Sequence, residues 1–183
     1  MQPINKKIRV IEKKDIIHAI EILNSLMGDF NSAIITYVWS SNESEMPDKY
    51  RNWANAIGMM SLNYLILSLA KWNEFYKKFK NIIPSEFKED CKNLSMWIDK
   101  SKIKSLRNKN VVHVWDMENK KPIYNSEYKK LISEITNGNI FYFFEKINSH
   151  QPTYPKSIVG ICQGIRDCLA KKHSILGKEI TEL

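Results

Sequence analysis

The sequence predicts an all-α fold, an up-and-down bundle of about five long helices, from three observations. Glycine and proline number only 6 each in 183 residues, which leaves too few turns for a chain built mainly from strands. The prolines separate long stretches in which apolar residues recur every three or four positions, as on one face of a helix. Apolar residues make up 43% of the chain. That is enough for one sizeable core, so we expect residues 1–183 to form a single helical domain.

The first two predicted helices differ in the number of sides that they bury. Residues 15–38 carry one apolar stripe, with Asp15 as a candidate N-cap. Residues 48–80 carry two apolar stripes, which indicates a central helix packed on both sides. The first stripe consists of Trp53, Ile57, Met60, Tyr64 and Leu67, and the second of Leu62, Leu65, Leu69 and Trp72.

Three further helices follow. The third begins near Ser85, a candidate N-cap, and we leave its end open because the β-branched residues of the run 111–115 are poor choices inside a helix. The fourth spans about residues 126–147 and is expected to be split or bent at Asn137-Gly138. The last spans about residues 157–176.

Charge and cysteine content narrow the classes of protein. The formal net charge is +8, which favours an anionic partner. The three cysteines form no CxxC motif, so we expect reduced thiols in or near a helical core. The most apolar stretch, residues 57–70, is shorter than the roughly 20 residues of a membrane span. We therefore expect a cytoplasmic protein with no membrane contact and no secretory signal.

Known enzyme signatures are absent from the sequence. It contains no GxGxxG, Walker A, HExxH or GxSxG motif. None of the four histidines lies near cysteines at the spacing of zinc ligands. We therefore expect neither a metal site nor a cofactor.

A basic segment is the first candidate site. Its cations are Lys100, Lys102, Lys104, Arg107 and Lys109, with no acidic residue among them. Spacings of four and three place Lys100, Lys104 and Arg107 on one face of a continuous helix, where they would attract phosphate groups. The alternative interpretation is a solvated face at the carboxyl end of a helix, where cations suit the helix dipole.

The order of residues at the end of this segment adds a resemblance. Arg107-Asn108-Lys109-x-x-Val112-His113 resembles the R-N-K-x-x-A-H form of the Rx4-6H motif. That motif marks the HEPN superfamily, small all-helical proteins of toxin–antitoxin, abortive-infection and RNA-processing systems. The match covers about seven residues, and it departs from the pattern at Val112, where alanine is usual.

The resemblance implies a metal-independent endoribonuclease of the toxin–antitoxin or phage-defence type. Arg107, Asn108 and His113 would be its catalytic residues, and Lys100, Lys104 and Lys109 would bind RNA phosphates. The family's site is composite, which implies a homodimer, and a cognate antitoxin protein is a possible partner. Some HEPN toxins carry a modifiable tyrosine two residues after the histidine, where this chain has Trp115.

Other interpretations stay open at this point. Arg166 and His173 also satisfy the Rx4-6H spacing and lie on the same helix face. Arg107 and His113 would lie about 120° apart on a straight helix, so their convergence needs a distorted or ending helix. A non-catalytic HEPN-like module that binds RNA, nucleotide or protein is the main functional alternative. A bundle with no nucleic-acid role is the third, marked by Arg107 in a surface salt bridge and a buried His113.

Overall fold

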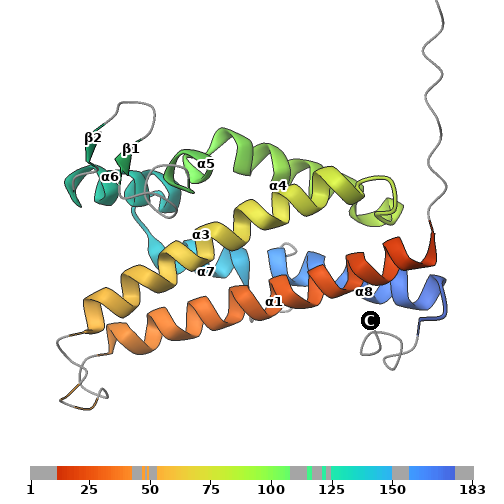
Figure 1. Ribbon diagram of the computed structural model, residues 1–183, viewed down its shortest axis with the longest axis horizontal. Coiled ribbons are helices and arrows are strands. Elements are labelled where there is room, and N and C mark those ends of the chain that lie inside the picture. Colours follow the sequence, from red (N-terminus) through yellow and green to blue (C-terminus); the bar gives the residue numbers. More distant parts are fainter. Residues whose placement is uncertain are drawn as a thin grey trace, which may run out of the picture.

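The computed structural model describes residues 12–42, 47, 49, 53–107, 115–116, 121–122, 125–149 and 157–175, and it confirms the all-α bundle (Figure 1). In chain order its helices are α1 (Lys13–Ser41), α3 (Ala54–Phe79), the 3-10 turn η1 (Ser85–Phe87), α4 (Lys88–Lys100), α5 (Ile103–Leu106), α6 (Asn125–Thr136), α7 (Ile140–Ile147) and α8 (Ile158–Lys172). A pair of two-residue strands, β1 (Trp115–Asp116) and β2 (Lys121–Pro122), is antiparallel.

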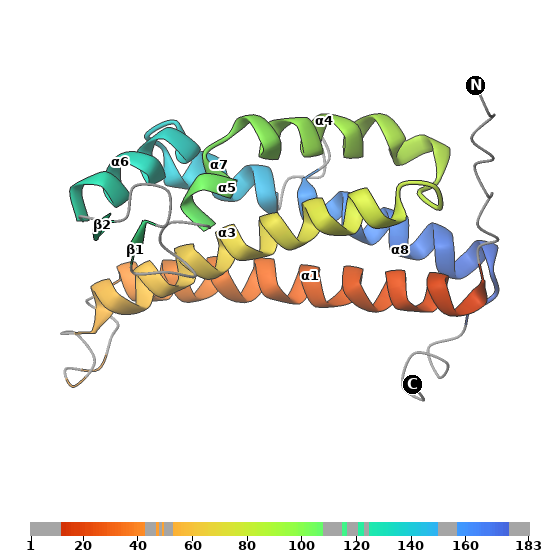
Figure 2. The same ribbon diagram turned by 45° about the horizontal axis from the view of Figure 1, so that its top comes forward.

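The two longest helices, α1 and α3, form an antiparallel hairpin that runs the length of the molecule (Figures 1 and 2). α4 turns back along α3, and α8 packs against α1. Buried side chains from these elements join in one apolar core, at whose centre Leu23, Phe30, Leu69 and Trp72 are fully buried. The second stripe predicted for residues 48–80 therefore faces this core, as expected.

The start of α1 differs from the prediction in one detail. The N-cap residue is Glu12, and Asp15 occupies the third helical position, so the prediction that Asp15 is the cap was wrong. The Asp15 carboxylate accepts a hydrogen bond from the Glu12 amide at 3.5 Å. An acidic side chain in the first turn suits the positive end of the helix dipole, which is why the pattern placed the cap three residues too late.

The predicted bend in the fourth helix is confirmed. Asn137 and Gly138 adopt positive φ angles of 51° and 71° and separate α6 from α7. Asn139 then caps α7, since its side-chain oxygen accepts a hydrogen bond from the Tyr142 amide at 2.9 Å. The helix predicted over residues 126–147 is thus split into α6 and α7, one of the two expected outcomes.

Both short helices are fastened to the hairpin by polar and aromatic contacts. The Tyr128 hydroxyl of α6 donates a hydrogen bond to the side-chain oxygen of Asn63 in α3 at 2.7 Å. In α7, the ring of Phe144 packs edge-on against Tyr37 of α1, with centroids 5.1 Å apart. α6 and α7 therefore cover one side of the α1–α3 hairpin.

The helix α8 closes the bundle on the other half of α1. Ser157 is its N-cap, as its hydroxyl accepts a hydrogen bond from the Gly160 amide at 3.2 Å. Gly164 in α8 faces the Phe87 ring at the end of η1, so closely that a Cβ atom at this position would overlap the ring. Among the described helices, none is long and apolar enough to cross a membrane.

The Gly164 contact generates a stability prediction. We expect Gly164→Ala to lower the free energy of unfolding by about 1–3 kcal/mol, because the added methyl group must displace a packed aromatic ring. The matched control is Gly28→Ala, at a helical glycine with no atom near the added Cβ, which should raise stability by about 0.5–1 kcal/mol. Urea denaturation of both variants checks the pair. Equal effects at the two positions would contradict the close approach of Phe87 and α8.

Candidate functional site

The basic segment does not lie on one continuous helix, so the predicted shared face of Lys100, Lys104 and Arg107 was wrong. Ser101 takes an extended conformation and ends α4. Its hydroxyl donates to the Ile98 carbonyl at 2.8 Å and accepts from the Ile103 amide at 3.4 Å. A serine that bonds the backbone in this way competes with helical hydrogen bonds. Lys100 thus ends α4, whereas Lys104 belongs to α5.

The one-turn helix α5 positions Arg107. Its residues Ile103 and Leu106 are fully buried, and they anchor α5 against the core although it has only 4 residues. The Arg107 amide still donates hydrogen bonds to the carbonyl oxygens of Ile103 and Lys104. The position of the Arg107 backbone is therefore set by the two buried side chains of α5.

The Arg107 side chain forms a surface ion pair. Its Nη1 lies 2.6 Å from Oε1 of Glu74 in α3, and the two side chains are 37% and 63% exposed. An ion pair this open to water contributes about 0–1 kcal/mol, so another anion can replace the carboxylate at little cost. The guanidinium is held at the surface by a partner that a phosphate group would have to displace.

A polar chain next to this ion pair links α3 to α4. Ser95 donates a hydrogen bond to Asn73 at 2.6 Å, and Asn73 donates to Asp99 at 2.9 Å. Lys77 donates to the same Asp99 oxygen at 3.0 Å. The Lys77 hydrogen bond, helped by Asn73 and by the charges of Lys77 and Lys104, holds the pKa of Asp99 below its usual value despite its partial burial.

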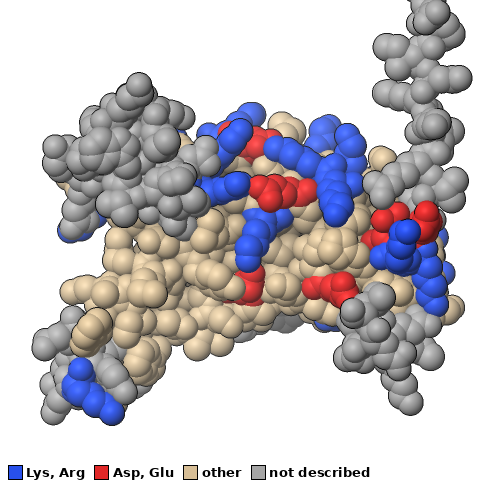
Figure 3. All heavy atoms as spheres, in the orientation of Figure 1, with Lys and Arg blue, Asp and Glu red and all other residues tan. Residues whose placement is uncertain are grey.

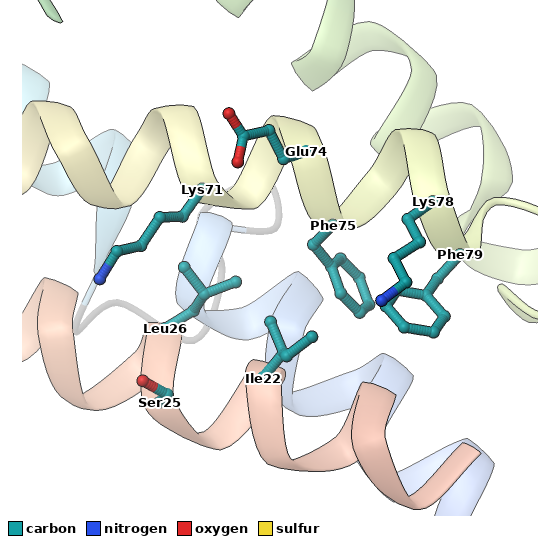
Figure 4. Close-up of a pocket in the computed structure, with 8 residues that line it drawn as sticks. All are labelled: Ile22, Ser25, Leu26, Lys71, Glu74, Phe75, Lys78 and Phe79. Atoms are coloured by element: carbon teal, nitrogen blue, oxygen red, sulfur yellow. The ribbon is translucent and has the colours of Figure 1, made fainter. Parts of the chain in front are cut away.

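A groove of about 350 Å³ runs between α1 and α3 on the other side of Glu74 (Figure 4). Its lining consists of Ile22, Ser25, Leu26, Lys71, Glu74, Phe75, Lys78 and Phe79. Figure 4 shows the Glu74 carboxylate turned away from the groove, while Lys78 lies along Phe79, with Nζ 5.0 Å from the ring centroid. The groove has an apolar floor and cationic edges, and it offers no nucleophile beside a base.

The remaining residues of the predicted catalytic site, Asn108 and His113, lie outside the described residues, as does Lys109. Lys100 and Lys104 are exposed. The structure therefore places the arginine and two lysines of the predicted site, and the convergence of Arg107 with His113 stays a prediction. A bundle with no nucleic-acid role would be marked by Arg107 in a surface salt bridge and by a buried His113. The structure shows the first of these two features.

The second Rx4-6H candidate has a different environment. Nε and Nη2 of Arg166 lie 2.8 and 2.7 Å from one carboxylate oxygen of Asp167, and Nη1 lies 3.4 Å from the side-chain oxygen of Asn24. His173 caps the end of α8 and is half-buried. It lines a cavity of about 510 Å³ together with Lys13, Lys88 and Lys172. Arg166 is thus bound by its sequence neighbour Asp167 and by Asn24 of α1.

Cysteine and metal chemistry have no visible site in the described part of the chain. No group of three or more His, Cys, Asp or Glu side chains there is arranged to hold a metal ion. Cys91 and Cys162 are buried and Cys168 is half-buried, in or near the helical core as the composition led us to expect. Burial raises the pKa of the Cys162 thiol to about 12, so this group is a poor nucleophile near neutrality.

The sequence did not indicate the residues that hold the site, Glu74 and Asn73. One signal was available for Asn73. It falls four residues after Leu69, on the stripe that faces the core, and a polar side chain on a buried stripe indicates a hydrogen-bond partner. Glu74 gives no such signal, because an exposed glutamate on a helix is ordinary.

Comparison with known proteins identifies a structural neighbour and no family. An integron cassette protein, Vpc_cass2, from the mobile metagenome of V. paracholerae, matches with a TM-score of 0.72. The match covers 88% of this chain and 99% of that chain at 23% sequence identity. No family model and no curated protein matches the chain. At this identity the likeness establishes a shared fold and nothing about activity.

The polar chain across α3 and α4 generates a second stability prediction. We expect Asn73→Ala to cost about 1–3 kcal/mol of unfolding free energy, because it leaves the buried Ser95 hydroxyl without its acceptor. Thermal or urea unfolding measures the loss. Asn93→Ala, at an exposed position of α4, is the control and should change stability by at most about 0.5 kcal/mol. A cost no larger than that of the control would show that Asn73 does not tie α3 to α4.

Proposed function

We propose that this chain is a metal-independent endoribonuclease of the HEPN type, acting in the cytoplasm in a toxin–antitoxin or phage-defence role. The observation that carries the proposal is the placement of Arg107. The buried anchors of α5 hold it at the surface, immediately before Asn108 and the rest of the Rx4-6H motif. The all-α bundle agrees with the fold that the resemblance implies.

In the proposed reaction the RNA is its own nucleophile. The 2′-hydroxyl oxygen attacks the adjacent phosphorus, and the bond from phosphorus to the 5′ oxygen breaks. The products are a 2′,3′-cyclic phosphate and a free 5′-hydroxyl. Such a step needs a base for the 2′ proton, an acid for the leaving oxygen and positive charge near the phosphorane.

The motif residues divide these roles between two copies of the chain. His113 of one copy takes the 2′ proton and His113 of the other donates a proton to the 5′ oxygen. Arg107 stabilises the phosphorane, since its planar fork matches phosphate oxygens, and Asn108 holds the phosphate. Lys100, Lys104 and Lys109 bind neighbouring phosphates of the same strand.

Cleavage of a mixed pool of tRNA and single-stranded RNA in excess EDTA tests the proposal. We expect wild-type protein to cleave. We expect His113→Ala to lose cleavage about 10²-fold or more, as for loss of a general acid–base group, and Arg107→Ala to lose about as much, as for loss of a group that stabilises transition-state charge. Arg107→Lys should also be impaired, because lysine lacks the bidentate fork.

The control is His173→Ala, which should cleave like wild type. Loss of cleavage in His173→Ala alone would move the site to the end of α8. A folded wild-type protein that leaves every RNA in the pool intact would contradict the proposal as stated.

The Arg107–Glu74 ion pair favours a second candidate, a non-catalytic HEPN-like module. An arginine that serves to join α5 to α3 would be structural, and the chain would then bind RNA, nucleotide or protein without cutting. The two candidates differ in what Glu74 does. In the ribonuclease, Glu74 competes with the RNA phosphate for Arg107, whereas in the non-catalytic module Glu74 holds α5 against α3.

Removing the Glu74 charge separates the two roles. In the His113→Ala background, where RNA stays intact, we expect Glu74→Gln to tighten RNA binding by up to about fivefold, the equivalent of a surface ion pair of about 1 kcal/mol. Fluorescence anisotropy with a labelled single strand measures the change. The control is Glu134→Gln, at an exposed position of α6. It also removes one negative charge, away from Arg107, and should change RNA affinity less than Glu74→Gln does. Unchanged or weaker binding by Glu74→Gln would favour the structural role.

A further inference from the structure

In the half of the hairpin that holds the end of α1 and the start of α3, neither helix carries a charged side chain. Residues 30–42 and 53–70 contain no Asp, Glu, Lys or Arg. α6 and α7 cover one side of this half. Figure 3 shows the opposite side as a broad surface free of blue and red, over the adjoining parts of α1 and α3. We call this surface the uncharged face and define it by its exposed side chains, which are Ile35, Trp39, Trp53, Met60 and Tyr64.

These side chains are unusually open for their size. Met60 is 70% exposed, Ile35 68% and Trp53 63%. A fully exposed aromatic side chain presents about 150–250 Å². Taking that range for all five side chains, their exposed fractions together give roughly 400–700 Å² of mostly apolar surface, which matches or exceeds the largest apolar patch of a typical monomer, about 300–600 Å².

The uncharged face has a hollow into which a neighbour can fit. A groove of about 350 Å³ lies between the two helices, lined by Ser32, Ala33, Thr36, Ile57, Met60, Ser61 and Tyr64. The small side chains on its α1 wall keep the groove open. Met60 lines the groove, and the exposed Ile35 directly precedes Thr36 of its α1 wall, so the face offers both protruding side chains and a place to receive them.

Among the described residues, charged side chains lie at the border of this face. The Tyr64 hydroxyl donates a hydrogen bond to Asp29 at 2.6 Å, and Lys71 lies 3.2 Å from the other oxygen of that carboxylate. This cluster crosses between α1 and α3 and neutralises its own charges. The remainder of a chain with net charge +8 repels a second copy, and the uncharged face does not.

We propose that the uncharged face binds the same face of a second copy of this chain across a two-fold axis. Ile35 and Met60 of each copy would enter the groove of the other, which is the self-complementary arrangement of an isologous interface. Two such faces would bury roughly 800–1,400 Å², around the lower limit of about 1,200 Å² for specific protein interfaces. Four helices, two from each copy, would then pack as in a bundle.

The sequence pattern supports a contact of this kind. The two apolar stripes on α3 indicate a helix packed on both sides, and the structure buries the stripe that contains Leu65 and Trp72. The stripe that contains Trp53 and Met60 stays open in one copy. RNA is a poor occupant, since none of the five side chains that define the face is a cation that could meet a phosphate. The uncharged face of a second copy is the partner with matching chemistry, because its five defining side chains are also mostly apolar and carry no charge.

The proposed ribonuclease also needs two copies of the chain, but the uncharged face does not include Arg107, so this inference stands apart from the activity. The uncharged face needs cover whether or not Arg107 binds RNA. A dimer that depends on Met60 but cleaves no RNA would support the interface and contradict the activity. RNA cleavage by a protein whose association does not depend on Met60 would support the activity and contradict the interface.

Sedimentation equilibrium of the full chain, from about 1 to 100 μM, tests the interface over the affinities expected for this area. We expect a wild-type dimer, with association weakened at least about tenfold by Met60→Glu, which places two buried charges against each other. Ile35→Glu is a second, independent variant on α1. Tyr142→Glu is the matched control, since Tyr142 is 59% exposed on α7 and lies outside the uncharged face, and its association should equal that of wild type.

Circular dichroism and thermal melting check that each variant is folded. A wild-type protein that remains monomeric throughout this range would overturn the proposal. So would a dimer that survives both Met60→Glu and Ile35→Glu, or one that Tyr142→Glu disrupts to the same extent.

Discussion

The packing of α1 against α3 is the constraint on which the rest of the structure depends. Trp72, in the middle of α3, is completely buried and stacks on Tyr76, with ring centroids 5.8 Å apart and planes 8° from parallel. Leu23 and Phe30 meet the same core from α1. Each of the other helices buries its apolar side on this hairpin or on a helix already attached to it. Most of the stability of helices in proteins comes from tertiary packing of this kind, and not from the helix alone.

The fold could be predicted from the sequence because its information is local and periodic. Apolar residues at helical spacing locate α1, α3, α4 and α8, and Asn137-Gly138 marks the bend between α6 and α7 because its backbone takes positive φ angles. The break at Ser101 could not be predicted in the same way. Residues 88–107 continue in a helical pattern, and serine is compatible with a helix until its hydroxyl finds backbone partners. Burial of Ile103 and Leu106 then requires the chain to start a second helix after Ser101, and no local sequence pattern specifies this restart.

The candidate site was predictable only in part, for a related reason. Arg107 could be selected from the motif and from the charge around it. Its ion pair with Glu74 joins residues far apart in the chain, on helices whose relative rotation is set by the core. The same holds for the bonds from Asn73 to Ser95 and Asp99. The sequence therefore indicates which residues carry charge, while the packing of α3 against α4 and α5 decides which of them meet.

The small size of α5 has a consequence for how the protein responds to heat. Four residues cannot sustain a helix through their own hydrogen bonds, so α5 keeps its shape only while Ile103 and Leu106 remain in the core. Segments attached by so few contacts open at a lower free-energy cost than the whole molecule. The surface that presents Arg107 would then melt before the α1–α3 hairpin does. Any function that relies on this arginine would be lost over a range of temperatures in which the bundle itself is still intact.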